Sequence, residues 1–431
     1  MIDIKLIREK PDFVKNNARN KGYEVDIDRL LELDSNKIRL LGEIQKLREK
    51  RNELSNSSQG HKPSEDQINK VKSIKHALED KEKELNDITL ELDELLSQVP
   101  NIALDSVPVG KSEEDNVVTK VVGELPKFNF DPKNHYQIAL KMDWLDKVRA
   151  AKVAGSRFNY IKNGLVELQF GLIQFVFKTL QDKEVISSVI KENNLNLVDK
   201  AFIPILPPAL IKTEVYRESA RLDAKNVTYK LEDDDLWLNA SAEHSLCTMY
   251  KDEILEEREL PIRYIGYSTS FRREAGSYGK DMEGMFRSHQ FDKLEMEVFS
   301  TPETGLEEHK LLIGLQEYLL NQLKIPYRYV LKCSADIGFP NSSGVDLEAW
   351  LPGQNNYRET HSADYMADFQ SRRLKTRIKM NSGEIVFAHT NDATAIVLSR
   401  IPIAIIENYQ DEQGRVSLPQ VLKPYLNRDY L

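Results

Sequence analysis

Apolar residues recur at alternating intervals of three and four in two stretches near the amino end of the chain. The first stretch, 30–54, carries leucines and an isoleucine on this spacing, and Lys37 and Arg51 fill the positions that the pattern skips. The second stretch, 68–96, repeats the spacing with Lys81 as its interruption. This heptad pattern predicts two long helices, each with one apolar seam and an otherwise charged surface.

A polar segment, 56–66, separates the two stretches and is rich in Ser, with Gly and Pro, as is typical of a turn. Two helices joined by a turn predict an antiparallel coiled-coil hairpin over about 28–98, with a reach of roughly 40 Å at ~1.5 Å per residue. Such hairpins are more often spacers or dimerisation elements than RNA-binding arms, and a solvated helix would also mix cations with glutamates. The cations on the exposed face are Lys46, Arg48, Lys50, Arg51, Lys70, Lys72 and Lys75.

The hairpin is followed by 98–116, where prolines and an acidic, polar run indicate a linker. Beyond it, 143–157 and 165–180 have the pattern of helices, and short runs with two-residue alternation continue to the carboxyl end. This alternation predicts an antiparallel sheet, and the sequence has no GxGxxG motif to indicate a Rossmann domain. We therefore predict an α+β chain with an N-terminal domain over 1–104 and a larger domain over 105–431.

Composition narrows the class of protein. The chain has 431 residues, 40% of them hydrophobic, which is enough for two or three domains with apolar cores. A formal net charge of -9 argues against nonspecific nucleic-acid binding, so any RNA contact must come from local basic patches. Cys247 and Cys333 lie far apart, without CxxC spacing or a neighbouring ligand cluster, which disfavours a disulfide framework or a cysteine zinc site. With no apolar signal core and no membrane-length run, we expect a reduced cytosolic enzyme.

The strongest chemical signal is 271–297, which has the pattern of a strand, a glycine-bearing loop and a second strand. Arg272 and Arg287 stand at the two ends of the loop, and a guanidinium offers phosphate oxygens a planar fork of donors. Phe291 offers a flat face to a base, and Glu274 can accept hydrogen bonds from an amine. A surface hairpin with paired charges is the plainer alternative, but the combination favours a bent nucleoside triphosphate over a sheet.

This hairpin resembles motif 2 of the class II aminoacyl-tRNA synthetases, specifically of the seryl-tRNA synthetases. Further matches follow in the order expected for that family: 201–212 is similar to motif 1, 237–246 to the Thr-x-Glu signature with Ser241 in place of threonine, 346–373 to the DLEVW-P-Q--YRE segment, and 389–410 to motif 3. The resemblance implies a class II catalytic domain, with an antiparallel β-sheet flanked by helices. It also implies that the helical arm grips the long variable stem of a tRNA.

The resemblance implies that Arg272 contacts the α-phosphate and the substrate carboxylate, while Arg287 and Arg400 hold the bent γ-phosphate. Glu274 would bind the adenine amine, and Phe291 would stack on the ring. The expected ATP-binding residues are Arg272, Arg273, Glu274, Arg287, Ser288, Phe291, Glu359, Ser362 and Arg400.

Glu359 and Ser362 would hold Mg²⁺ on the triphosphate, because carboxylate and hydroxyl oxygens suit this ion. The reaction needs positioning and charge neutralisation and no side-chain nucleophile, so we expect Arg272, Arg400 and Glu359 to be the catalytic residues.

The serine site is implied in the same way. Glu243 would pair with the α-ammonium group, and Glu295 and Thr394 would bind the serine hydroxyl, so alanine would leave them unpaired. The expected serine-binding residues are Ser241, Glu243, Arg272, Glu295 and Thr394.

The chain departs from the family in motif 3. The family usually has Asn-Gly-Ser-Gly where this chain has Asp-Ala-Thr-Ala over 392–395, and Ser399 replaces the glycine before Arg400. Glycine is generally kept where the backbone approaches a ligand or needs a positive φ. Because the replacements are small, we expect the pocket to be retained.

The resemblance implies a serine–tRNA ligase that forms seryl-adenylate from L-serine and ATP. It would transfer serine to tRNA(Ser), and to tRNA(Sec) where that tRNA exists, as a homodimer without membrane association. One alternative is a paralogue that loads a carrier protein, although such paralogues typically lack the arm. Another is a degenerate, non-catalytic homologue that serves as a coiled-coil interaction protein.

Overall fold

The chain divides into two compact units, Met1–Ile102 and Ala103–Leu431. In this computed structural model, the residues described are 1–56, 64–222, 227–274 and 284–431. No helix in these ranges combines the length and the apolar character needed to cross a bilayer. Cys247 and Cys333 are both buried as free thiols.

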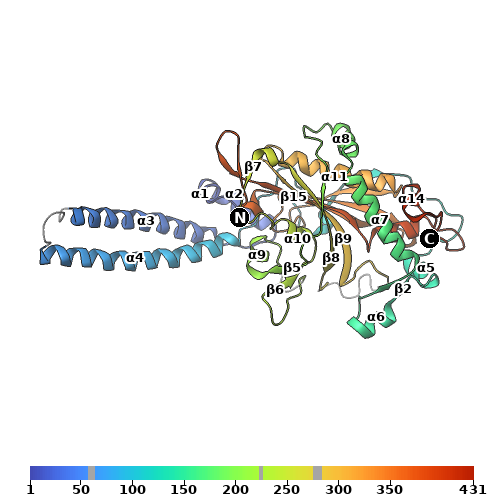
Figure 1. The fold of residues 1–431 in the computed structure, drawn as a ribbon, viewed down its shortest axis with the longest axis horizontal. Coiled ribbons are helices and arrows are strands. Elements are labelled where there is room, and N and C mark those ends of the chain that lie inside the picture. Colours follow the sequence, from blue (N-terminus) through green and yellow to red (C-terminus); the bar gives the residue numbers. More distant parts are fainter. Residues whose placement is uncertain (57–63, 223–226, 275–283) are drawn as a thin grey trace. The chain divides into compact units, whose positions relative to one another are not determined.

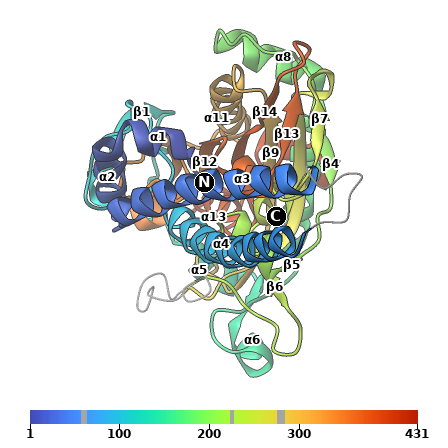
Figure 2. The ribbon, with the colours of Figure 1, turned by 90° about the vertical axis from the view of Figure 1, so that its left-hand side faces the viewer.

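The first unit is helical, and its two long helices run side by side as the predicted hairpin (Figures 1 and 2). Ion pairs between the helices fix an antiparallel arrangement, because Arg29 pairs with Glu91 at 2.9 Å and Arg48 with Glu82 at 2.8 Å. The helices of this unit are α1 (Ile4–Glu9), α2 (Pro11–Asn20), α3 (Ile27–Asn56) and α4 (Glu65–Ser97).

The heptad positions form the contact between α3 and α4. Ile44, Ile74 and Leu78 are buried in one apolar cluster between the two helices. Lys81, which interrupts the apolar pattern, forms an ion pair with Glu43 across the hairpin. The predicted coiled-coil arm is therefore confirmed, and 57–63 of its expected turn lie outside the described residues.

The second unit is built on an eight-stranded sheet with the order β1-β10-β11-β12-β15-β9-β8-β4 (Figure 1). All neighbours are antiparallel except β4 and β8, which confirms the predicted antiparallel architecture. The strands are β1 (Val117–Val122), β4 (Ile203–Ile205), β8 (Ile262–Phe271), β9 (Gln290–Ser300), β10 (Tyr327–Leu331), β11 (Ser343–Leu351), β12 (Asn356–Ala367) and β15 (His389–Val397).

One face of this sheet is covered by helices and carries the core. The α11 helix packs on β9, β11, β12 and β15, and its leucines join one large apolar cluster with those strands. Because this face is closed by apolar contacts, the opposite face remains for polar side chains. The helices of this unit are α5 (His135–Lys141), α6 (Lys147–Ala154), α7 (Gly164–Leu180), α8 (Lys183–Glu192), α9 (Thr213–Glu218), α10 (Glu243–Leu246), α11 (Gly305–Gln322), α12 (Phe369–Leu374), α13 (Ile401–Asn408) and α14 (Lys423–Leu426).

Three small sheets complete the described part of the unit. They are formed by β7 (Ile254–Glu256), β13 (Arg377–Lys379) and β14 (Ile385–Phe387), by β2 (Leu145–Asp146) and β3 (Tyr160–Ile161), and by β5 (Leu210–Lys212) and β6 (Leu236–Leu238).

The helix expected over 143–157 is shorter than the sequence predicted. Asp146 accepts a hydrogen bond from the backbone N–H of Arg149 and caps the helix, so that α6 begins only at Lys147. The residues before it pair with β3 instead.

Candidate active site

Strict alternation along β9 separates the core from the candidate site. Leu294 and Met296 point into the apolar cluster, whereas Lys293 and Glu295 lie on the opposite, polar face. Thr394 on β15 is the cross-strand neighbour of Glu295 and lies on the same face. The second strand of the predicted hairpin therefore forms the floor of a polar site.

A hollow opens above this floor and brings together most of the predicted ATP-binding residues. All three predicted catalytic residues border it. Its lining residues are Arg272, Glu274, Phe286, Ser288, Phe291, Lys293, Glu359, Thr360, Ser362, Thr394, Val397, Ser399 and Arg400.

Arg272 is held at the end of β8 by contacts on several sides. Its Nε donates to the carbonyl of Ala240 at 3.1 Å, and its guanidinium carbon lies 5.3 Å from the centre of the Phe291 ring. The Nδ1 of His289 hydrogen-bonds the Arg272 carbonyl at 2.9 Å, and the Arg272 N–H donates back to the His289 carbonyl. His289 thus joins the two ends of the hairpin, and its Nδ1 is engaged in a hydrogen bond with the backbone.

Arg400 and Glu359 form an ion pair in the hollow, with Nη1 2.9 Å from Oε1. Although desolvation opposes it, the guanidinium of Arg400 lowers the pKa of Glu359 to about 2. The same guanidinium carbon lies 5.0 Å from the centre of the Phe286 ring. Glu359 is therefore an ionised carboxylate at neutral pH.

A β-bulge places Glu359 and Ser362 on the same face of β12. Ser362 pairs with Asp346 and Glu359 pairs with Glu348, so Thr360 is an extra residue on this strand. Without it, residues three apart would point to opposite faces. The two oxygen donors therefore border one hollow, and this donor set fits Mg²⁺, which prefers carboxylate, hydroxyl and water oxygens.

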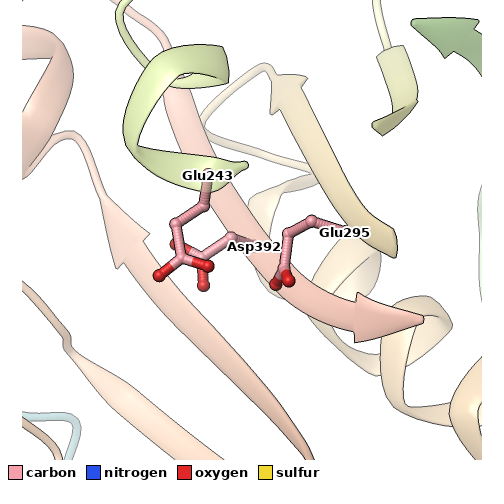
Figure 3. Close-up of side chains that lie close together, drawn as sticks. All are labelled: Glu243, Glu295 and Asp392. Atoms are coloured by element: carbon pink, nitrogen blue, oxygen red, sulfur yellow. The ribbon is translucent and has the colours of Figure 1, made fainter. Parts of the chain in front are cut away.

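Beneath the hollow, Glu243, Glu295 and Asp392 turn their carboxylates toward one another, with an oxygen of each within 4.8 Å of the others (Figure 3). Lys293 joins this acid triangle to the hollow, because its Nζ contacts Glu295 and lies 3.4 Å from Glu243 Oε2 and 3.1 Å from Ser241 Oγ. Because a lysine ammonium already occupies the triangle, its spacing alone does not make it a metal site.

The acid triangle sets the pKa values of its members apart. Burial raises the pKa of Glu295 well above its usual value, and the nearby carboxylates of Glu243 and Asp392 act in the same direction. Despite burial, Lys293 holds the pKa of Glu243 well below its usual range, with help from His244. Glu243 is therefore the carboxylate best suited to carry a negative charge toward a cationic group.

Asp392 has a counter-ion of its own. Arg221 pairs with Asp392, and their side chains are 12% and 4% exposed. Asp392 is also the cross-strand neighbour of Glu297 on β9 and of Asp364 on β12. Neither carboxylate oxygen of Glu297 is hydrogen-bonded within the described residues, and burial raises its pKa well above the usual value. Arg221 is thus the guanidinium at the centre of a buried acidic row.

Some predicted site residues lie elsewhere. The Arg273 guanidinium carbon lies 5.7 Å from the centre of the Tyr229 ring, and Arg273 is absent from the lining of the hollow. Arg287 is likewise absent from that lining, but its Nη1 lies 3.2 Å from Glu274 Oε2, at the border of the hollow. Of the hairpin loop, 275–283 lie outside the described residues.

The replaced glycines of motif 3 do not line the hollow, apart from Ser399. Ala393 and Ala395 are fully buried in the apolar core, and neither has a positive φ. Ala395 is the extra residue where the register of β15 against β9 shifts between Thr394 and Ile396. The backbone conformation at these two positions is therefore compatible with alanine, which agrees with the expectation that the pocket is retained.

Lys293, Arg221 and Asp392 were not predicted as site residues. Lys293 could have been found from the alternation of β9, since it precedes Glu295 by two residues. The pairing of Arg221 with Asp392 joins residues that are 171 positions apart, and no local pattern indicates it.

The seven predicted tRNA-binding cations all lie exposed on α3 and α4. Three of them have acidic partners within the arm: Arg48 pairs with Glu82, Lys70 with Asp66, and Lys75 with Glu79. Within the described ranges, the four cations that form no ion pair are Lys46, Lys50, Arg51 and Lys72.

Comparisons with known proteins agree with this geometry. Residues 1–103 match the model of the seryl-tRNA synthetase N-terminal domain, and residues 228–409 match that of the tRNA synthetase class II core domain (G, H, P, S and T). A serine–tRNA ligase of Dictyoglomus turgidum is 38% identical over 433 residues, covering 99% of this chain and 98% of that protein. One from Pyrococcus horikoshii is 37% identical over 99% of this chain and 96% of its own length.

Solved structures give the same result. The seryl-tRNA synthetase of Pyrococcus horikoshii, complexed with ATP, superposes with a TM-score of 0.89 at 36% identity, covering 100% of this chain and 99% of its own. The cytoplasmic serine–tRNA ligase of Naegleria fowleri, in complex with AMP, gives a TM-score of 0.85 at 28% identity over 100% of this chain and 98% of its own. The chain therefore belongs to the seryl-tRNA synthetase family.

Proposed function

We propose that this chain activates L-serine with ATP and transfers the seryl group to tRNA(Ser). One observation carries the proposal: Arg272, Glu359 and Arg400 border a single hollow, next to the buried carboxylates of Glu243 and Glu295. An oxygen of the serine carboxylate attacks the α-phosphorus of ATP, the bond to pyrophosphate breaks, and seryl-adenylate forms. The 3′-hydroxyl of the tRNA then attacks the carbonyl carbon, and AMP leaves.

The positions of the cations support this chemistry. Arg272 lies against Phe291 and can neutralise the serine carboxylate and the α-phosphate together while the adenine stacks on that ring. Arg400 and Arg287 are the cations for the γ-phosphate, and each has a carboxylate partner that phosphate oxygens would replace. Glu274 would then be released to bind the adenine amine, with Ser288 beside it.

Glu359 and Ser362 are the proposed residues for Mg²⁺, because both border the hollow from the same face of β12. When bound, the ion would neutralise charge on the phosphates. Before the nucleotide binds, Glu359 is ionised, because Arg400 lowers its pKa despite desolvation.

Serine selection is proposed for the floor of the site. Glu243, joined by Ser241, would pair with the α-ammonium group, and Glu295 with Thr394 would bind the hydroxyl. If alanine bound instead of serine, Glu295 and Thr394 would lack the hydroxyl as a hydrogen-bond partner. Leaving these buried polar groups unpaired costs more binding free energy than the loss of a methyl contact would.

The helical arm is proposed to bind the tRNA through its seven cations. The unpaired ones, Lys46, Lys50, Arg51 and Lys72, can approach phosphates without first breaking an ion pair in the described part of the arm. Use of tRNA(Sec) and a cytosolic location stay predictions.

A homodimer is proposed through the motif 1 region. Leu206 is 76% exposed, Met249 is 45% exposed, and both border an apolar hollow with Pro207 and Pro208. A second copy of the chain would remove this apolar surface from water.

The two alternative functions have no support. Relatives that are serine–tRNA ligases match over the full length, arm included, and the charged residues of the hollow are all present. Neither a carrier-loading paralogue nor a non-catalytic homologue explains this combination as well.

The experiment that tests the proposal is exchange of labelled pyrophosphate into ATP at ample Mg²⁺, with serine, threonine, alanine and glycine compared. Exchange should depend on serine and should be lost in Arg272→Ala. Absence of exchange with serine would refute the proposed activity.

A further inference from the structure

Three buried side chains form a relay of close polar contacts behind the acid triangle. The hydroxyl of Tyr216, on α9, hydrogen-bonds Nδ1 of His244, and Nε2 of His244, on α10, lies 3.4 Å from Oε1 of Glu243. Tyr216 is fully buried, and His244 and Glu243 are 6% and 8% exposed. Since solvent contributes little here, the donors and acceptors of these three groups must match each other.

The direction of the relay follows from the two neighbours of the His244 ring. Nε2 lies beside the Glu243 carboxylate, which can only accept, so the proton of the neutral ring belongs on Nε2. Nδ1 then accepts, and the Tyr216 hydroxyl is its donor.

The opposite tautomer is unfavourable for two reasons. It would leave the Tyr216 O–H without an acceptor in a buried place, and it would turn the Nε2 lone pair toward a carboxylate. Burial also lowers the pKa of His244, which keeps the ring neutral and leaves the negative charge of Glu243 uncompensated by it.

The other carboxylate oxygen of Glu243 is fixed as well. Ser241 Oγ donates to Oε2 at 2.6 Å, and Lys293 Nζ lies 3.4 Å from the same oxygen. With His244 Nε2 beside one oxygen and the Ser241 hydroxyl on the other, the carboxylate plane cannot rotate freely.

We propose that Tyr216 and His244 are positioning residues that set the orientation of the Glu243 carboxylate toward the α-ammonium group of the amino acid. The inference rests on the proposed function, since it assigns the amino-acid subsite of that reaction. Tyr216 acts only through His244, and His244 acts only on Glu243. The relay therefore governs the amino acid and leaves the nucleotide subsite unchanged.

The test measures pyrophosphate exchange with serine and ATP varied separately in Tyr216→Phe, His244→Phe and the double variant. Tyr216→Phe removes one oxygen and keeps the ring, so we expect kcat/KM for serine to fall about tenfold. KM for ATP should change less than about twofold, because no relay residue borders the phosphate hollow. The double variant should lose no more than His244→Phe alone, because the two residues act in series.

Tyr250→Phe is the matched control, since it removes a hydroxyl that lies 2.6 Å from the Tyr264 hydroxyl in a separate apolar cluster. It should leave KM for serine unchanged. The inference is overturned if KM for serine and ATP rise together, if neither changes, or if the two losses add. A wild-type chain without serine-dependent exchange would overturn the proposed function and this inference with it.

Discussion

Arg221 pairs with Asp392 at the base of the candidate site, and both side chains are almost completely removed from solvent. Glu243, Glu295 and Glu297 lie around this pair, so that Arg221 faces more carboxylates than it can neutralise alone. Burial raises the pKa of Glu295 and Glu297, which lowers the total negative charge of the row. Arg221 and Lys293 together thus supply the positive charge in this buried acidic part of the sheet.

We expect Arg221→Ala to destabilise the protein by about 3–5 kcal/mol, because it leaves Asp392 buried without its counter-ion. Urea unfolding would measure this. Arg415→Ala is the control, since Arg415 pairs with Asp411 but is 61% exposed, and should cost at most about 1 kcal/mol. If the two substitutions lowered the free energy of unfolding equally, the buried ion pair would contribute no more to stability than the exposed one.

His309 should destabilise the folded chain below neutral pH. Its side chain is buried, and its ring centre lies 6.0 Å from the ring centre of Tyr365. Neither ring nitrogen is hydrogen-bonded within the described residues, and burial lowers the pKa of His309 to about 4. The unfolded chain binds the proton more readily, so stability is lost as the pH falls from about 6.5 toward 4. From pH 7 to 5 this amounts to about 2 kcal/mol.

In His309→Phe this part of the pH dependence should disappear, as urea midpoints measured at pH 5 and pH 7 would show. The aromatic contact with Tyr365 is retained in this variant. An unchanged difference between the two pH values would contradict the assignment to His309.

Glu359→Gln should raise the Mg²⁺ concentration needed for pyrophosphate exchange and lower the rate about 100-fold, because the amide cannot neutralise the ion. A Mg²⁺ titration of the exchange rate would test this. Glu348→Gln is the control, since Glu348 is the cross-strand neighbour of Glu359 but pairs with Arg328 and does not border the hollow. Loss of activity in both variants would show that the substitutions disturb the pairing of β11 and β12, and would contradict a specific role of Glu359.

Shortening the arm should separate activation from tRNA charging. Glu43 and Lys81 contact each other across the hairpin, so a short Gly-Ser connector between them can replace 44–80. This removes all seven candidate cations and keeps the buried base of the arm, with Leu40 and Leu92. Exchange should persist, and tRNA charging should be lost.

A milder version of the same test reverses charges in the full-length arm. Glutamate at Lys46, Lys50, Arg51 and Lys72 should weaken tRNA binding and reduce its salt dependence, measured as the slope of log K against log salt. Reversal at the paired Lys70 and Lys75 should change that slope less. Identical slopes in all variants would exclude the arm as the phosphate-binding surface.

Leu206→Asp should convert a homodimer into monomers, because a carboxylate on this exposed apolar surface would be buried without a partner at the interface. Sedimentation velocity would measure the change. Val153→Asp, at an equally exposed valine on α6 (73% exposed), is the control and should leave the association state unchanged.

Local patterns were sufficient for the arm. The heptads placed Ile44, Ile74 and Leu78 in the hairpin contact. This prediction succeeds because the helix period acts over a few neighbouring residues. The alternation of β9 also separates core from site, but Lys293 was not predicted from it.

Other features depend on contacts that no local pattern contains. Arg221 and Asp392 meet only because the loop after α9 returns to the sheet, and Arg273 turns to Tyr229 although its neighbour Arg272 borders the hollow. The bulge at Thr360 is a third example, since two-residue alternation would have placed Glu359 and Ser362 on opposite faces.

The extra residue at Thr360 separates the sequence spacing of the two oxygen donors from their spacing in the sheet. Deleting Thr360 would leave Glu359 and the serine two positions apart, and regular alternation also places residues two apart on one face. The bulge therefore lets β12 carry one residue more than the facing strand without turning either donor into the hydrophobic interior.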